Sequence, residues 1–371
     1  MILPCTKENI PAVVELFTEK PAQVNPVEHA ALCEYFQEVY LGNPWYDPEL
    51  PSLVCQDASG RIEGFQGLIP RPMALETGEQ VRAVVASNLR GGGDRYGQAN
   101  PLMALRLTKA CLEGPQDLTV AYSSNWEAKK IWEACGGIAA TLYSFNWLRP
   151  IRPARALLEL AETQRGRAVQ RGLRPLADAA DVIGAKLLAR LARDGRATYT
   201  VAELDRQFAV EALRQVPGFD LRPRYDLASY SWLLEMSRNS VVGGWLRAAM
   251  VKDGPGQREV GWFVYSQRWK RVGRVLQLVA MRGHFDTVLR AAIADAASKG
   301  LALLYGEVDP TDLQPYSDTA CLLHTGRWML IHARRPALLE SFLRGKALFS
   351  GLDGDGWLRP LWSPALRRAV V

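Results

Sequence analysis

The sequence predicts an α/β (α+β) chain of two similar domains, each with a mixed central sheet flanked by helices. Apolar, strand-like segments alternate with amphipathic helical segments, and the same order of elements occurs twice. A chain of 371 residues is also longer than one hydrophobic core usually supports. We expect domains at 1–150 and 196–345, joined by a helical, arginine-rich linker at 151–195 and followed by a C-terminal tail at 346–371.

The first half begins with short elements of a mixed sheet. A strand is expected at residues 1–5, and a helix begins at Thr6. A hairpin then joins strands at 53–56 and 62–69 through the turn Asp57-Ala58-Ser59-Gly60.

A strand–turn–helix unit follows and carries the main functional signal. The apolar strand at 81–89 leads into a glycine-rich turn at 90–99, and the next helix has Asn100 as N-cap and Pro101 at its first position. Successive glycines let backbone N–H groups point into one concavity, and a helix N-terminus adds partial positive charge there. The turn predicts an anion site that fits a pyrophosphate, and a purely structural turn is the alternative.

The next strand is expected at 118–122, and the helix that follows this strand carries a family resemblance. Four residues have the spacing of the acyl-CoA N-acyltransferase signature, in which asparagine opens this helix and glycine ends it: Asn125, Ala128, Trp132 and Gly136. The chain therefore resembles the GNAT superfamily, in a tandem two-domain form. In the family's turn pattern, Gly97 and Ala99 match, whereas Asp94 departs from the usual glutamine or arginine.

The resemblance implies that amides of the turn bind the pyrophosphate of coenzyme A. Acetyl-CoA or another acyl-CoA is then the cosubstrate, and no metal is expected. The residues expected to hold the coenzyme lie at the strand end, in the turn and at the next helix start: Leu89, Arg90, Gly91, Arg95, Tyr96, Gly97, Gln98, Ala99 and Asn125. The acyl carbonyl is expected beside the strand ending at Leu89, where backbone amides polarise it.

Three residues are candidates for proton handling in the catalytic step: Tyr122, Glu63 and Ser87. Tyr122 ranks first because it ends the strand beside the expected coenzyme, although a buried tyrosine with a satisfied hydroxyl is the alternative. In many family members a tyrosine on the following helix protonates the departing thiolate, and Trp132 occupies that position here. An indole has no proton that titrates in the useful range, so Trp132 is interpreted as a packing residue.

The second half repeats the order of elements. Helices are expected at 208–216 and 225–236, a hairpin at 245–252 and 260–265, and a strand, helix and strand at 275–280, 285–298 and 301–307. The turn Met281-Arg282-Gly283-His284 has one glycine and offers too few amides to hold a pyrophosphate. We expect no coenzyme in this half, which instead forms a wall of the acceptor pocket. Glu307 and Asp309 end a strand, where α/β folds place reactive groups, and a strand-end turn is the alternative.

The net charge of +6 lies entirely between Arg149 and Arg196. We interpret these arginines as the solvated face of linker helices. The alternative is a basic surface for a phosphate-bearing partner or for an acyl carrier protein that serves as donor. Nucleic acid is not favoured, because the segment has no aromatic side chains for stacking.

Composition excludes several other classes. No run of about 18 apolar residues occurs, so we expect no membrane partner. The first residues lack the pattern of a secretory leader, which favours a cytoplasmic location. Six cysteines and four histidines show no metal-ligand spacing. Trp45, Trp269 and Trp357 look exposed and are candidates for interfaces.

These observations predict an acyltransferase that moves an acyl group from acyl-CoA to an amine-bearing small molecule or peptide. Two alternatives remain open. One is a catalytically inactive acyl-CoA-binding or scaffold protein, and the other is an acyltransferase that takes its acyl group from an acyl carrier protein.

Overall fold

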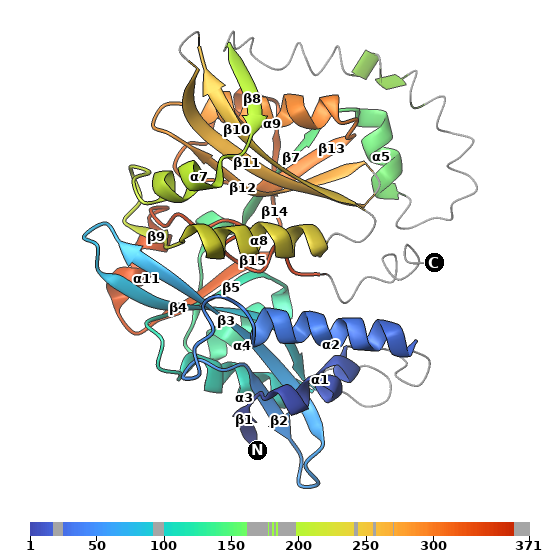
Figure 1. The fold of residues 1–371 in the computed structure, drawn as a ribbon, viewed down its shortest axis with the longest axis vertical. Coiled ribbons are helices and arrows are strands. Elements are labelled where there is room, and N and C mark those ends of the chain that lie inside the picture. The colour runs from blue at the N-terminus through green and yellow to red at the C-terminus, as the bar shows by residue number, and fades with distance from the viewer. Residues whose placement is uncertain are drawn as a thin grey trace.

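The computed structural model contains two mixed sheets, one above the other in Figure 1, with helices packed on and between them. The structure describes residues 1–17, 25–91, 100–161, 177, 180–181, 183–184, 198–240, 244–254, 257–269 and 271–359. The glycine-rich turn at 92–99 and most of the arginine-rich linker lie outside the described residues. The expectations for Arg95, Tyr96, Gly97, Gln98 and Ala99 therefore remain predictions.

Among the described residues, the first sheet has the strand order β1-β2-β3-β4-β5-β15-β6, and β9 pairs with β3. Its strands are β1 (Ile2–Pro4), β2 (Leu53–Gln56), β3 (Ile62–Leu75), β4 (Gln80–Gly91), β5 (Leu118–Ser124), β6 (Ile138–Ala139), β9 (Leu221–Pro223) and β15 (Trp328–Ala333). The helices of this half are α1 (Ile10–Leu16), α2 (Pro26–Tyr40), α3 (Pro101–Leu112) and α4 (Trp126–Ala134).

The second sheet has the order β14-β7-β13-β12-β11-β10-β8. Its strands are β7 (Phe145–Pro150), β8 (Tyr199–Glu203), β10 (Trp245–Asp253), β11 (Arg258–Trp269), β12 (Val272–Ala280), β13 (Leu303–Glu307) and β14 (Leu322–Thr325). The remaining helices are α5 (Pro153–Ala161), α7 (Arg206–Leu213), α8 (Leu227–Asn239), α9 (Phe285–Ser298), α10 (Gln314–Asp318) and α11 (Pro336–Leu343). The two sheets confirm the predicted fold class.

Short polar side chains set the helix starts. Asn100 accepts hydrogen bonds from two amides in the first turn of α3, and Asn125 accepts one in α4, as the sequence predicts. Asp205 and Asp226 cap α7 and α8 in the same way. These side chains satisfy backbone donors that a helix otherwise leaves unpaired, and so they fix where each helix meets its sheet.

Each half contains one parallel strand pair that is short. β4 and β5 pair only over 83–85 and 118–120, and β12 and β13 pair only over 272–274 and 303–305. Beyond these registers the strands of each pair are no longer hydrogen-bonded to each other. The same divergence in both halves supports the duplicated architecture that the sequence indicates.

The two halves exchange one strand each. β15, from the second half of the chain, pairs between β5 and β6, whereas β7, from the first half, pairs between β14 and β13. The expected boundary at residue 150 thus follows a strand that belongs to the second sheet. One cluster of buried apolar side chains also includes residues of both halves, such as Val85 and Leu276. The two sheets therefore form a single packed unit.

The first part of the expected tail, residues 346–358, is largely buried. Asp353 is fully buried, with Oδ1 accepting from the Tyr225 hydroxyl at 2.5 Å and Oδ2 from the Ser350 amide at 2.7 Å. Its carbonyl accepts from Arg71 Nε at 2.9 Å. Residues far apart in the chain thus hold this segment in place.

The predicted exposure of Trp357 is wrong. Its side chain is fully buried and packs edge-on against Trp232, with ring centroids 5.5 Å apart. Trp45 is half-buried and contacts the same Trp232 ring. The side chain of Trp269 lies outside what the structure describes. Trp357 therefore packs in the hydrophobic core.

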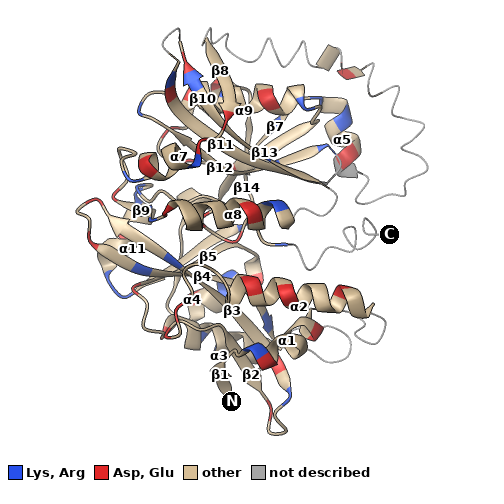
Figure 2. Ribbon diagram, in the orientation of Figure 1, with Lys and Arg blue, Asp and Glu red and all other residues tan. Residues whose placement is uncertain are grey.

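Charged residues of both signs are spread over both halves in Figure 2, and α2 carries several acidic ones. No helix among the described residues has the length and apolar character needed to span a membrane. The predicted basic surface of the linker falls mainly in residues 162–176 and 185–197, which the structure does not describe.

Replacing the buried carboxylate should destabilise the protein. We expect Asp353→Ala to lower the free energy of unfolding by about 3 kcal/mol, because Tyr225 and Ser350 lose a buried partner. Urea unfolding measures this change. Asp312→Ala, at an exposed position, is the control and should change stability by less than about 0.5 kcal/mol. Equal stability of the two variants would contradict the inferred anchoring of the segment.

Candidate functional site

The candidate site begins where β4 and β5 diverge. Both strands have a β-bulge just beyond their last parallel pair, Val85 with Val120. Asn88 in β4 has φ 47° and Ser123 in β5 has φ 61°. A left-handed backbone costs energy for residues other than glycine, and such conformations cluster at functional sites. The paired bulges therefore mark the diverging ends of β4 and β5 as a candidate functional site.

Side chains from neighbouring elements hold the bulge of β4. Asn88 and Leu89 together stand opposite a single residue of β3, Gln66. Gln66 Nε2 donates to the Ser87 carbonyl at 2.9 Å, and Asn88 Nδ2 donates to the Tyr40 hydroxyl at 2.8 Å. The Tyr40 and Ser87 hydroxyls are 3.2 Å apart. The backbone around Leu89 is therefore fixed, as a strand that polarises a carbonyl requires.

Glycines allow α3 to begin directly over the end of β4. A Cβ atom at Gly64 would lie 2.8 Å from Met103 Sδ, and one at Gly91 would lie 3.0 Å from the Asn100 carbonyl oxygen. Side chains at either position would push the helix away from the strand. The N-terminus of α3 thus lies next to the turn for which the sequence predicts anion binding.

The other predicted coenzyme residues that the structure describes surround this helix start. Leu89 and Arg90 are half-buried and Gly91 is buried. Arg90 Nε donates to the Leu16 carbonyl at 3.1 Å, and burial lowers the pKa of its guanidinium. Asn125 caps α4 by accepting from the Ala128 amide at 2.8 Å.

Trp132 packs as the sequence predicts. It is 4% exposed, and its Nε1 donates to the Ile331 carbonyl of β15 at 3.1 Å. A side chain at Gly137 would collide with its ring. Trp132 therefore joins α4 to the exchanged strand, and its indole N–H is used in this hydrogen bond.

A cavity of about 210 Å³ lies at the end of β5, where the two sheets meet. Its lining comes from β5, the segment before and within β7, β12, β13, β14 and the β14–β15 connection: Tyr122, Ser123, Tyr143, Asn146, Arg274, Tyr305, Glu307, His324, Gly326 and Arg327. We call this cavity the junction pocket. Both halves of the chain are needed to form it.

The structure places only one of the three proton-handling candidates in the junction pocket, namely Tyr122. Ser87 packs against Tyr40 on α2, and Glu63 pairs with Arg61, at 2.6 Å from Glu63 Oε1 to Arg61 Nη2. The structure therefore does not bring Glu63 and Ser87 together with Tyr122.

An ion pair of the second half lies beside Tyr122. Arg274 Nη2 is 3.0 Å from Glu307 Oε1, and the guanidinium carbon is 5.9 Å from the centroid of the Tyr122 ring. Burial alone would lower the pKa of Arg274, but the Glu307 carboxylate raises it above its usual range. Arg274 therefore stays cationic and holds Glu307 in a fixed position. The sequence predicted Glu307 as a strand-end reactive group, and the geometry keeps it as a candidate.

The Tyr122 hydroxyl is buried, with 4% of the residue exposed; it has no hydrogen bond of normal length and angle to a described residue, and the nearby Glu307 side chain acts on it. Burial, followed by the charge of Glu307, raises the pKa of Tyr122 well above its usual value. The hydroxyl remains protonated near neutral pH and is available to donate to a ligand. An unpaired buried hydroxyl costs about 1–3 kcal/mol, which a bound acceptor atom would recover.

A glycine-rich loop near the C-terminal end covers Tyr122. A Cβ atom at Gly354 would lie 2.6 Å from the ring, and one at Gly351 would lie 2.9 Å from the hydroxyl. Asp355, between the glycines of this loop, adds to burial in raising the pKa of both Tyr40 and Tyr122. The Asp355 carboxylate therefore influences both tyrosines, Tyr40 beside the β4 bulge and Tyr122 in the junction pocket. Sequence reasoning missed Asp355, although the run from Gly351 to Gly356 signals a close backbone approach.

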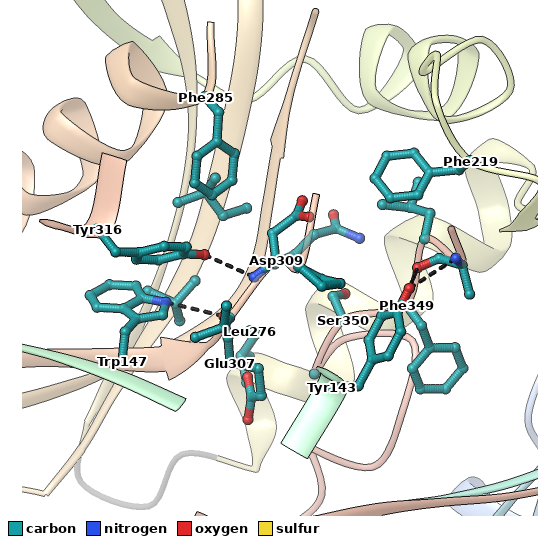
Figure 3. A pocket seen from close by; sticks show the side chains of 18 residues that line it. Tyr143, Trp147, Phe219, Leu276, Phe285, Glu307, Asp309, Tyr316, Phe349 and Ser350 are labelled. Atoms are coloured by element: carbon teal, nitrogen blue, oxygen red, sulfur yellow. Dashed lines mark hydrogen bonds between the residues drawn. The ribbon is translucent and has the colours of Figure 1, made fainter. Parts of the chain in front are cut away.

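The equivalent region of the second half is largely filled. The cavity between β12 and the end of β13 has a volume of only about 50 Å³. Figure 3 shows aromatic side chains around it, including Trp147, Phe285 and Phe349. The Leu352 amide donates to the Leu276 carbonyl of β12 at 2.8 Å, so the chain's own C-terminal segment covers this strand. The chain itself thus occupies most of the space where β12 and β13 diverge.

Comparisons of the structure with known proteins agree on the fold. A probable N-acyltransferase from Enterococcus faecalis V583 superposes with a TM-score of 0.56 at 9% identity, covering 93% of this chain and 73% of that one. A GCN5-related N-acetyltransferase from Anabaena variabilis gives 0.53 at 13% identity, covering 89% and 72%. Saccharomyces cerevisiae N-myristoyltransferase with bound myristoyl-CoA gives 0.50 at 11% identity, covering 90% and 78%.

The chain has the fold of the GNAT superfamily, in the tandem two-domain form that its sequence resembles. No family model matches the sequence, and no curated protein has a significantly similar sequence. The likeness to the solved structures therefore defines the fold, and the activity has to be argued from the site.

Removing the unpaired hydroxyl tests the geometry around Tyr122. We expect Tyr122→Phe to leave stability unchanged or to raise it by about 1 kcal/mol, because a buried hydroxyl without a partner disappears. Tyr143→Phe is the matched control. Its hydroxyl donates to the Ala347 carbonyl at 2.6 Å and accepts from the Ala347 amide at 2.9 Å. The control should lose about 1–2 kcal/mol in urea unfolding, and an equal loss in both variants would refute the unpaired state.

Proposed function

We propose that this protein transfers an acyl group from an acyl-CoA to an amine, with the coenzyme held by the first half. The observation that carries this proposal is the Tyr122 hydroxyl, which is buried, protonated and unpaired beside the junction pocket. The likeness to N-acyltransferase folds, including one crystallised with myristoyl-CoA, supports an acyl-CoA as donor.

In this proposal the pyrophosphate of the coenzyme lies at the N-terminus of α3. The turn with Arg95, Tyr96, Gly97, Gln98 and Ala99 supplies amides, as predicted. The pantetheine arm then runs between the diverging ends of β4 and β5. The thioester carbonyl lies beside the bulge, where the fixed backbone at Leu89 supplies a donor.

The chemical step is direct attack of the amine nitrogen on the thioester carbonyl. A carbon–nitrogen bond forms, the carbon–sulfur bond breaks, and the amine loses a proton. The carboxylates of Glu307 and Asp355 are the proposed acceptors of that proton. Tyr122 donates to the departing sulfur, and its high pKa ensures that the proton is present at neutral pH. The product is an amide, and free coenzyme A leaves.

The second half contributes the wall that faces the acceptor. Arg274 keeps Glu307 in place through their 3.0 Å contact, and its Nη1 donates to the Gly356 carbonyl at 3.3 Å. These contacts connect β12, β13 and the C-terminal loop. We infer that this half positions groups for the reaction and binds no coenzyme of its own.

A catalytically inactive acyl-CoA-binding or scaffold protein is the second candidate. Trp132 favours this second candidate, because it packs at the helix position where many family members carry a tyrosine that protonates the departing thiolate. An acyl carrier protein as donor also stays a proposal, since the linker that would dock it is mostly outside the described residues. A cytoplasmic location, an absence of metal and an amine-bearing small molecule or peptide as acceptor complete the proposed function.

Kinetics of Tyr122→Phe test the proposed role directly. We expect kcat to fall by about 100-fold with an unchanged KM for acyl-CoA, because the variant cannot protonate the leaving sulfur. Thiol release from acetyl-CoA and longer acyl-CoAs, with a panel of amines, measures this effect. Tyr46→Phe, at an exposed position, is the control. Unchanged turnover would remove Tyr122 from the mechanism, and calorimetric binding of acyl-CoA without thiol release would favour the inactive binding protein.

A further inference from the structure

The charges that line the junction pocket do not balance. Glu307 is its only acidic residue, and it is paired with Arg274. Arg327 also lines the pocket; it is exposed, and no carboxylate within the described part of the chain forms an ion pair with it. The lining therefore includes a solvent-accessible guanidinium that no described carboxylate neutralises. A ligand with a negative group would supply the missing partner.

The fold fixes the backbone that carries Arg327. Arg327 lies in the connection through which the chain passes from β14 in the second sheet to β15 in the first. The Gly326 amide donates to the Ser144 carbonyl at 3.3 Å, and a side chain at Gly326 would collide with Asn146. On the other side, Trp328 pairs with Ser124 of β5, two residues after Tyr122. The backbone at Arg327 is thus held by contacts with both sheets, beside β5, the strand that carries the Tyr122 hydroxyl.

The surroundings of Arg327 are suited to a carboxylate. Asn146 and His324 line the same pocket and pair with each other across β7 and β14. Asn146 Nδ2 donates to the Ser144 carbonyl at 3.5 Å and has a second N–H, and His324 Nδ1 lies 3.3 Å from the Thr325 carbonyl. A guanidinium with nearby neutral donors binds a planar carboxylate well.

We propose that the acceptor is a small aminocarboxylic acid, such as a free amino acid, whose carboxylate binds Arg327 while its amine faces Tyr122 and Glu307. This inference rests on the proposed acyl transfer. The cavity of about 210 Å³ is smaller than the roughly 300 Å³ at which pockets for drug-sized ligands begin. It therefore suits a ligand of amino-acid size.

The charge pattern also gives the acceptor a direction. Glu307 is already paired with Arg274, so Arg327 sets the direction by attracting the carboxylate. A ligand of the opposite orientation would place its ammonium group beside the Arg327 guanidinium, which is unfavourable. The nitrogen is thereby held on the side of the thioester, as direct attack requires.

The test compares acceptors that differ only in their carboxylate. Thiol release is measured at saturating acyl-CoA with amino acids, with their methyl esters and amides, and with short peptides. The free acids should have a kcat/KM at least about 10-fold above that of the esters and amides, through a lower KM. Arg327→Gln should remove this preference, raise KM for the acids about 10-fold or more, and leave KM for esters and acyl-CoA unchanged.

Arg282→Gln removes an equal charge at an exposed position outside the junction pocket and is the matched control. The ratio of kcat/KM for free acids to that for esters and amides should be the same in this variant as in the wild type. Thermal unfolding of both variants verifies that they are folded. A change of the same size in both would show a general charge effect and overturn the inference.

Each other outcome has a definite meaning. Equal rates for acids and esters, or faster turnover of peptides, would overturn this inference and leave the proposed transferase standing. A raised KM for acyl-CoA in Arg327→Gln would assign this residue to the coenzyme and overturn the inference. Thiol release with none of the acceptors would overturn the proposed function, and this inference with it.

Discussion

The pairing of the exchanged strands is the constraint on which the rest of the structure depends. β15 pairs with β5 through Ile331 and Val120, and β7 pairs with β13 through Trp147 and Gly306. Each sheet therefore contains a strand supplied by the other half of the chain. Tyr122, two residues before the end of β5, and Glu307, the last residue of β13, are held in fixed relative positions for this reason. A single-domain version of either half would lack one wall of the junction pocket.

The two copies of the fold have diverged through one segment, residues 346–359. It covers β12 through Leu352, and it is anchored by Asp353 between Tyr225 and Arg71. The same segment presents Asp355 toward the first half. One stretch of chain thus fills the cleft of the second copy and completes the surroundings of the first. This gives a physical reason for the single coenzyme site that we propose in a duplicated scaffold.

Local signals in the sequence were enough to predict much of the fold. Asn100 and Asn125 cap their helices as expected, and the packing role of Trp132 follows from its chemistry. The strand exchange could not be predicted, because short strands such as β6 and β14 have no periodicity that reveals a distant partner. The burial of Trp357 was missed for the same reason.

The site was predicted in part. The sequence predicts a strand end at Tyr122; in the structure this residue lies two positions before the end of β5 and lines the pocket, whereas Glu63 and Ser87 do not. Arg274 and Asp355 come from segments more than 150 residues beyond Tyr122 in the chain, and only the tertiary fold brings them to it. Local sequence patterns carry no information on such contacts.

A crystal structure with bound coenzyme A is the most direct test of a single coenzyme site in the first half. The diphosphate should lie at the N-terminus of α3, with the thiol between β4 and β5 and within reach of the Tyr122 hydroxyl. Coenzyme bound between β12 and β13, with the segment around Leu352 displaced, would contradict the assignment of roles to the two halves.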